Sequence, residues 1–184
     1  STTDTVIANG CTCHNTNQEA TSSVIVNLSL PTNFTSGETY TIVLNISGGP
    51  NDLSDGENQG GFFVTASDGE LTPIANDTYV QKPFGFTHLT HTVEGNDYRE
   101  WTFEWTAPSK DDISVQFVAY GNSVSGAGDG AANDYWNKKA ITLYGVNAVI
   151  EVEANEDLGF NDDERLYYPV RQMLLQLKIT KVKL

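Results

Sequence analysis

The stretch Arg99-Glu-Trp-Thr-Phe-Glu-Trp-Thr106 decides the fold class of this protein. Trp101, Phe103 and Trp105 alternate with polar residues, and alternate side chains of a β-strand point to the same face of a sheet. The stretch therefore predicts a strand with one aromatic face. Such a face either belongs to a core or offers a platform to a ligand. We expect the core, because aromatic residues at this period are typical of half-buried strands.

On either side of this strand, the same alternation recurs in short runs bounded by Gly, Pro, Asn or Asp, and no segment keeps a helical period. Strands are predicted over residues 23–30, 39–47, 61–67, 113–120 and 139–152. Runs of this length between turn residues predict an all-β fold, an antiparallel β-sandwich. We expect three parts: an N-terminal segment over residues 1–21, the sandwich over 22–153, and an acidic loop with a basic C-terminal strand or tail over 154–184.

Composition limits the classes of partner. The chain has 184 residues, 39% of them hydrophobic, which is enough for one domain with a core. Its formal net charge of −14 argues against nucleic acid or an anionic membrane as a partner. No stretch approaches the roughly 20 apolar residues of a membrane helix, so we expect no membrane span. The opening Ser1-Thr-Thr-Asp4 is typical of an exported protein whose signal peptide has been removed. Asn-X-Ser/Thr sequons, which glycans can occupy, lie at Asn27, Asn33, Asn45 and Asn76.

The only two cysteines lie together in Gly10-Cys11-Thr12-Cys13-His14. Two thiols followed directly by a histidine are the arrangement that holds a c-type haem, although two residues usually separate the cysteines and here there is one. In the leading interpretation one haem c per chain is attached to Cys11 and Cys13, with His14 as an axial ligand. A tetrahedral metal site is a second interpretation. A strained disulfide between the two cysteines is the third.

The other two histidines, His88 and His91, lie in one short run. A six-coordinate haem would take His14 on one side of the iron and His91 or His88 on the other. A metal site would take the two thiolates, His14 and one of this pair, with His91 preferred. Three residues apart on a strand, the pair points to opposite faces, so only one of them can bind a given iron. A spare His88 would serve the haem of a neighbouring subunit.

A series of short motifs extends from residue 10 to residue 150. It includes Leu30-Pro31, Gly48-Gly49, Gly61-Phe62, His91-Thr92, Trp101 to Pro108, Gly121-Asn122 and Trp136-Asn137. With the cysteine motif before it, this order resembles the reelin-N-terminal-like (Reeler) domains of exported bacterial and archaeal proteins. The resemblance implies an extracellular immunoglobulin-like sandwich with a c-type haem near its N-terminus. It also implies His14 and His91 as the motif histidines, whereas His88 has no counterpart.

Residues 165–184 are basic, unlike the acidic body, and supply half of the basic residues of the whole chain. Apolar residues alternate there, which predicts a strand with a bulge near Thr180. Three alternatives remain for this segment. It is the last strand of its own sheet, it adds as a strand to the sheet of the next subunit, or it forms a helix docked on the body. We therefore expect a homo-oligomer or filament joined through residues 169–184. The oxygen-rich loops over 51–60, 128–134 and 161–164 are either solvated turns or, less favoured, Ca²⁺ sites.

The function that follows is that of an extracellular c-type cytochrome-like protein, which transfers electrons through its haem as a monomer or in a filament. The alternative is a non-redox surface or filament subunit whose cysteine–histidine cluster holds a metal ion or a disulfide. The sequence has no Ser/His/Asp order, phosphate loop, HExxH or paired-carboxylate motif, so we do not expect an enzyme. Nothing in it identifies a redox partner.

Overall fold

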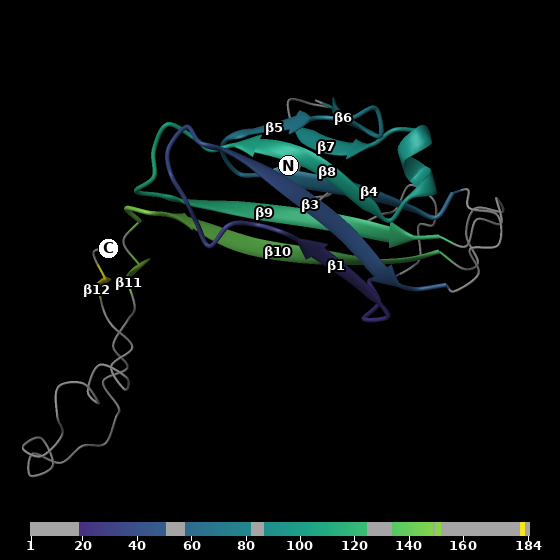
Figure 1. The fold of residues 1–184 in the computed structure, drawn as a ribbon. Helices are drawn as coiled ribbons and strands as arrows, with labels where there is room; N and C mark the ends of the chain where they lie inside the picture. The colour runs from purple at the N-terminus through teal and green to yellow at the C-terminus, as the bar shows by residue number, and fades with distance from the viewer. Residues whose placement is uncertain are drawn as a thin grey trace, which may run out of the picture.

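The computed structural model describes residues 19–50, 58–81, 87–124, 134–148, 150–151 and 181–182. Two β-sheets pack face to face, as the all-β prediction requires (Figure 1). The four-stranded sheet has the order β1 (Val24–Leu28), β3 (Thr39–Gly48), β8 (Glu100–Thr106) and β5 (Glu70–Pro73). The six-stranded sheet has the order β2 (Asn33–Phe34), β10 (Tyr135–Gly145), β9 (Ser114–Ser123), β4 (Gly60–Ala66), β7 (His88–His91) and β6 (Thr78–Gln81).

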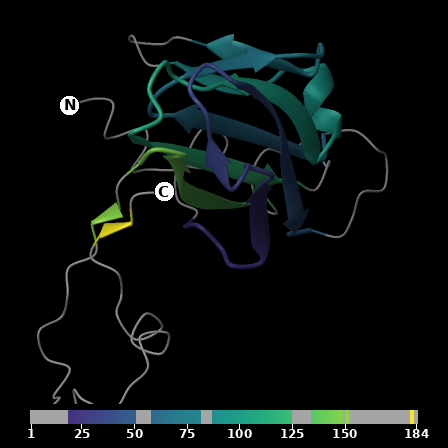
Figure 2. The ribbon, with the colours of Figure 1, turned by 60° about the vertical axis from the view of Figure 1, so that its left-hand side comes forward.

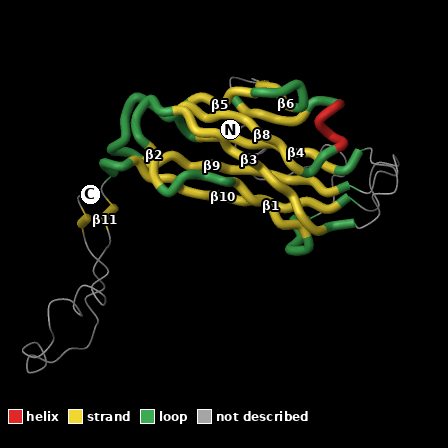
Figure 3. The backbone as a smooth tube through the Cα atoms, viewed as in Figure 1, coloured by secondary structure: helices red, strands yellow, loops and turns green. Residues whose placement is uncertain are grey.

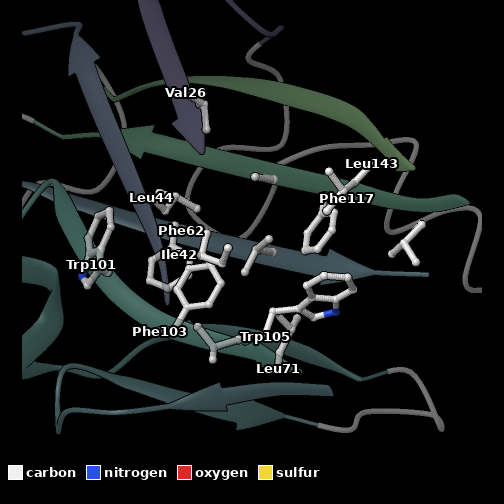
Figure 4. Packing of buried hydrophobic residues seen from close by; sticks show 14 of the residues in the cluster. Val26, Ile42, Leu44, Phe62, Leu71, Trp101, Phe103, Trp105, Phe117 and Leu143 are labelled. Carbon is white, nitrogen blue, oxygen red and sulfur yellow. The ribbon is translucent and has the colours of Figure 1, made fainter. Parts of the chain in front are cut away.

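The aromatic strand occupies the centre of the four-stranded sheet, and its aromatic face is core. Trp101 is 1% exposed, and Phe103 and Trp105 are fully buried. Figure 4 shows these rings between the two sheets, with Phe117 on the facing layer. The indole nitrogens of both tryptophans donate hydrogen bonds to main-chain carbonyls, that of Trp101 to Gly95 at 2.7 Å. The core interpretation is therefore confirmed.

One pair of strands departs from the antiparallel prediction. β2 runs parallel to β10, with Tyr144 opposite Asn33 and Gly145 opposite Phe34. The chain leaves the four-stranded sheet after β1 and crosses at Pro31 to the edge of the other sheet, where β10 runs in the same direction. Parallel strands need a long crossover between them, and more than a hundred residues separate these two in sequence. Because the two strands are so far apart in sequence, no local sequence pattern predicts that they pair.

The prediction of one strand over residues 139–152 is wrong in both bounds. β10 begins earlier, at Tyr135, and ends at Gly145, after which Val146 and Asn147 form a turn. A Cβ atom on Gly145 would lie 2.2 Å from the carbonyl oxygen of Asp111, so the strand ends where two backbones approach closely. β2, β5 and β6 were not predicted because two to four residues are too few for a period to register. The extended strand assumed through His88 and His91 is β7.

A short antiparallel pair lies apart from the sandwich (Figures 1 and 2). β11 (Ile150–Glu151) pairs with β12 (Lys181–Val182), so the described end of the tail pairs within its own chain. Residues 152–180 lie outside the described part, and exchange with a neighbouring subunit stays a prediction. Figure 3 shows the strands in yellow and, in red, the 3-10 turn η2 (Glu94–Asp97) at one end of the sandwich. Within the described ranges, no helix is long and apolar enough to cross a membrane.

Candidate functional site

The predicted site residues divide between described and undescribed parts of the chain. His88 and His91 are the first and last residues of β7. Cys11, Cys13 and His14 lie outside the described residues. The same holds for most of the predicted Ca²⁺ loops, and across residues 19–148 as far as they are described, no group of three His, Cys, Asp or Glu side chains is placed to hold a metal.

β7 is an inner strand of the six-stranded sheet. It pairs with β4 on one side, where Val64 lies opposite Leu89, and with β6 on the other, where Gln81 lies opposite His88. Leu89 is fully buried in the core between the sheets. Because successive side chains alternate, His88 points to the outer face of the sheet, away from the four-stranded layer.

His88 is only 5% exposed although it lies on an outer face. Its ring packs on Phe63 with the centroids 4.4 Å apart, and its Nε2 lies 3.1 Å from the side-chain oxygen of Gln81. The amide nitrogen of Gln81 donates to the hydroxyl of Tyr79, which turns the amide oxygen toward the imidazole. In the tautomer that this network assigns, Nε2 of His88 donates and Nδ1 carries the lone pair. A histidine that donates one N–H and keeps the other nitrogen as an acceptor has the pattern of a metal ligand.

His91 has a different environment. Its Nδ1 accepts a hydrogen bond from the main-chain nitrogen of Phe62 at 3.1 Å. Its ring lies so close to Gly61 that a Cβ there would be 2.6 Å from Cε1, and the ring centroid is 6.4 Å from that of Trp101. The neutral ring therefore carries its proton on Nε2. Ligation through Nε2 would require that proton to move to Nδ1, which also lies 3.3 Å from the carbonyl oxygen of Phe62. Ligation through either nitrogen would therefore cost the hydrogen bond from the main-chain nitrogen of Phe62.

The two rings do not share these neighbours, as expected from their spacing. The contacts assign His91 a structural role: its side chain supplies a partner for Phe62 where the ladder between β4 and β7 ends at Thr90. His88 bonds through Nε2 to a side chain, Gln81, and ligation through Nδ1 would leave this bond in place. His88 is thus the better placed of the two for ligation.

Sequence reasoning missed a set of aromatic residues around His88. We define the outer patch as the five residues Phe63, Thr65, His88, Tyr120 and Trp136. The rings follow one another across the outer face, with centroids 4.4 Å apart from His88 to Phe63, 5.8 Å from Phe63 to Tyr120, and 6.1 Å from Tyr120 to Trp136. The signal in the sequence is the doublet Phe62-Phe63, which makes β4 apolar on both faces.

Arg99 holds the end of the sandwich beside β4. Its guanidinium donates to the main-chain carbonyls of Gly48, Pro50, Gln59 and Val124 at 3.0 to 3.3 Å. Burial lowers the pKa of Arg99 from its usual value, and the group stays charged at neutral pH. Gly48 and Pro50 precede residues 51–57 and Val124 precedes residues 125–133, so one side chain fixes the ends of both segments.

The fold and these contacts define a two-layered β-sandwich protein with a buried histidine on its outer face. No family model matches the chain, and no curated protein sequence matches it. Among solved structures, it is similar to the human F-spondin reeler domain, with 14% identity and a TM-score of 0.43 over 68% of this chain and 92% of that chain.

Two further structures show similarity of the same order. The Reelin-N domain of F-spondin gives 15% identity and a TM-score of 0.44 over 77% of this chain and 97% of that one. AvmM, which catalyses macrocyclization in alchivemycin A biosynthesis, gives 11% identity and a TM-score of 0.37 over 74% of this chain and 94% of that one. A likeness this low transfers no ligand and no activity, so the candidate function rests on this chain's own residues.

Proposed function

We propose that this protein is an exported c-type cytochrome-like electron carrier. The observation that carries the proposal is the motif Cys11-Thr12-Cys13-His14, which contains both cysteines of the chain. Cys11 and Cys13 are the covalent anchors, and His14 is the proximal ligand. Attachment of haem to cysteines takes place outside the cytoplasm, so the protein works extracellularly or at the cell surface.

The second axial ligand comes from β7. The sequence resemblance favours His91, whereas the hydrogen bonds of the two rings favour His88. When bound, haem supplies a couple that takes up and releases one electron. The chain contributes the axial nitrogens and an apolar surround, which together set the potential.

The experiment is an absorption spectrum of the purified protein after a denaturing wash that removes non-covalent haem. We expect the haem bands to remain in the wild type. They should be lost from the double variant Cys11→Ser/Cys13→Ser, which serves as the matched control. A colourless wild type, expressed in a host that attaches c-type haem, would contradict the proposal.

The single residue between the two cysteines favours a second candidate. In it the protein is a non-redox surface or filament subunit, and the motif holds a metal ion or a disulfide. Elemental analysis and thiol titration of colourless protein separate these two forms. Bound zinc with unreactive thiols supports the metal, and a mass deficit of two hydrogens without metal supports the disulfide.

Assembly through the tail is part of the same proposal. Since β12 pairs with β11 of its own chain, an exchange of β12 for the same strand of a neighbour would keep every hydrogen bond of this ladder. Deletion of residues 169–184 should abolish assembly and leave the sandwich folded. Light scattering measures the first outcome and the tryptophan emission of the core the second. Unfolding of the truncated chain would contradict this use of the tail.

A further inference from the structure

Thr78 is a buried threonine whose hydroxyl has no evident use in the fold. It is the first residue of β6, is 4% exposed, and lies opposite His91 of β7. Its Oγ1 has no hydrogen-bond partner among the described residues. Val80, two residues on and on the same face of the strand, packs against the core. A valine at position 78 would keep the branched shape and leave no buried hydroxyl unpaired, so the fold alone favours valine there.

The same hydroxyl has a use in the chemistry of the chain. Thr78 completes the sequon Asn76-Asp77-Thr78. A glycan is transferred to an asparagine only where serine or threonine stands two residues later. Valine at position 78 would keep the strand and destroy the sequon. The residue that the folded sheet disfavours is therefore one that modification of Asn76 requires.

Asn76 is well placed to carry a glycan. It is exposed in the turn between β5 and β6. The hydroxyl of Thr92 donates to the carbonyl oxygen of Asn76 at 2.8 Å, and the main-chain nitrogen of Thr92 donates to that of Asp77 at 2.8 Å, so the turn is held at its backbone. β6 is the last strand of the six-stranded sheet, and no further described strand lies beyond it (Figure 1). A sugar on Asn76 can thus extend into solvent without disturbing the described packing.

The hydroxyls of the other three sequons need no such explanation. Ser29 accepts a hydrogen bond from the main-chain nitrogen of Val43 at 2.7 Å, so the fold uses its side chain. Thr35 and Ser47 are exposed, and their hydroxyls can bond to water.

The asparagines of these three sequons are also less accessible as a group. Asn33 and Asn45 are half-buried. The amide nitrogen of Asn45, the atom to which a glycan would be attached, donates to the carboxylate of Glu100 at 3.3 Å. Asn27 is exposed but lies directly opposite Asn45 in the ladder between β1 and β3. Asn76 combines an exposed acceptor in a turn with a hydroxyl that the fold does not explain.

We propose that Asn76 carries an N-linked glycan, attached before β6 joins its sheet. The proposal requires export, which is part of the proposed function, and does not depend on haem. In the reaction, Nδ2 of Asn76 forms a bond to the anomeric carbon of a sugar carried on a lipid-linked phosphate. The bond from that carbon to the phosphate oxygen breaks, the lipid phosphate leaves with the electron pair, and Nδ2 releases one proton. Because Thr78 is buried in the sheet, a transferase reaches its hydroxyl only before the chain folds.

The modification is tested on the full chain, exported from a host that attaches N-linked glycans to a control glycoprotein. Mass spectrometry of the peptide that contains Asn76 should find the glycan in the wild type and in Thr78→Ser, and not in Thr78→Val. An unmodified Asn76 in the exported wild type would overturn the proposal. Folded, unmodified protein should stay unmodified when transferase and lipid-linked donor are added, and its modification would overturn the order of events. Colourless protein with a glycan on Asn76 would contradict the haem and leave this proposal intact.

The argument from the unused hydroxyl is tested in a host without N-glycosylation. Thr78→Val should raise the thermal midpoint by about 2–4 °C, because a buried unpaired hydroxyl is removed. The matched control is Thr90→Val, which should lower the midpoint because the hydroxyl of Thr90 donates to the carbonyl oxygen of Phe62. An unchanged or lower midpoint for Thr78→Val would show that the fold uses the hydroxyl, through a water shared with the unpaired carboxylate oxygen of Asp77, and would overturn the inference.

Discussion

The Nδ1 atom of His91 lies 3.1 Å from the main-chain nitrogen of Phe62 and accepts its hydrogen bond. The side chain of His91 thus accepts a main-chain hydrogen bond that, elsewhere in the sheet, a neighbouring strand accepts. Replacing His91 with alanine should remove that partner and leave a void next to Trp101. We expect a loss of about 2–3 kcal/mol in the free energy of unfolding, measured by urea denaturation. Tyr98→Ala, at an exposed position, is the control and should cost under about 0.5 kcal/mol.

Gly61 provides the space that the ring of His91 occupies. A Cβ atom at position 61 would lie 2.6 Å from Cε1 of that ring, well inside contact distance. Gly61→Ala should therefore destabilise the protein by about 1–3 kcal/mol. In the double variant with His91→Ala, the new methyl group no longer meets the ring. The double variant should therefore lose less free energy of unfolding than the two single variants lose together. Additive effects in this double-mutant cycle would show that the ring is not what the new methyl group meets.

Arg99→Lys tests the carbonyl clamp at the end of the sandwich. Lysine keeps the charge but cannot reach four carbonyls from three chain segments with one planar group. We expect a loss of about 2–3 kcal/mol in the free energy of unfolding, because hydrogen bonds to a charged donor are lost near the core. The control is Lys138→Arg, on an exposed position of β10, which should be neutral within about 0.5 kcal/mol. Amide hydrogen exchange at Gly48, Gly49 and Val124 should rise in Arg99→Lys alone.

Acid should weaken the contact between Asp111 and the end of β10. The side chain of Asn147 donates to this carboxylate at 2.9 Å, and the main-chain nitrogen of Ser36 donates to it as well. These hydrogen bonds, that of Asn147 first, lower the pKa of Asp111 from its usual value. A pKa lowered by folding contributes stability above the unfolded-state value of about 3.9, and this stability is lost as the pH falls through the folded-state pKa.

The thermal midpoint of Asp111→Asn should therefore lie below that of the wild type at pH 7, and the difference should shrink as the pH falls below about 4. Asp112→Asn, at the exposed neighbouring position, is the matched control. A difference between Asp111→Asn and wild type that is the same at pH 7 and pH 3 would show that the charge of Asp111 does not matter.

Long strands were predictable from the sequence, and short ones were not. β8 alternates strictly over seven residues, and β3 and β9 alternate over most of their ten residues, so the sequence predicts these strands and their inner faces. β6 and β7 have four residues each; β7 takes its position by pairing with β4, which lies earlier in the chain and is not adjacent to it in sequence, and β6 pairs with β7. Local pattern contains no information about that pairing.

The same limit applies to the site. The sequence identifies His88 and His91 as the only imidazoles besides His14, and their spacing predicts that they have different neighbours. It does not show which ring bonds to the main chain, because the nitrogen of Phe62 reaches His91 only through the sheet. The outer patch was missed because a second aromatic face on β4 interrupts the alternation that marks a strand with one buried side.

The contacts between the two ends of the sandwich determine when it can fold. Thr21 bonds to Trp136, and β2 pairs with the last residues of β10, so residues near the start of the domain find their partners only near its end. During synthesis, the six-stranded sheet cannot be completed at its β2 edge until the chain has been made as far as Gly145. Folding then depends on contacts of high sequence separation, which are formed on the scale of milliseconds to seconds rather than microseconds. Until that point the aromatic strand lacks a complete second layer, and this is the interval in which the chain is most prone to aggregate.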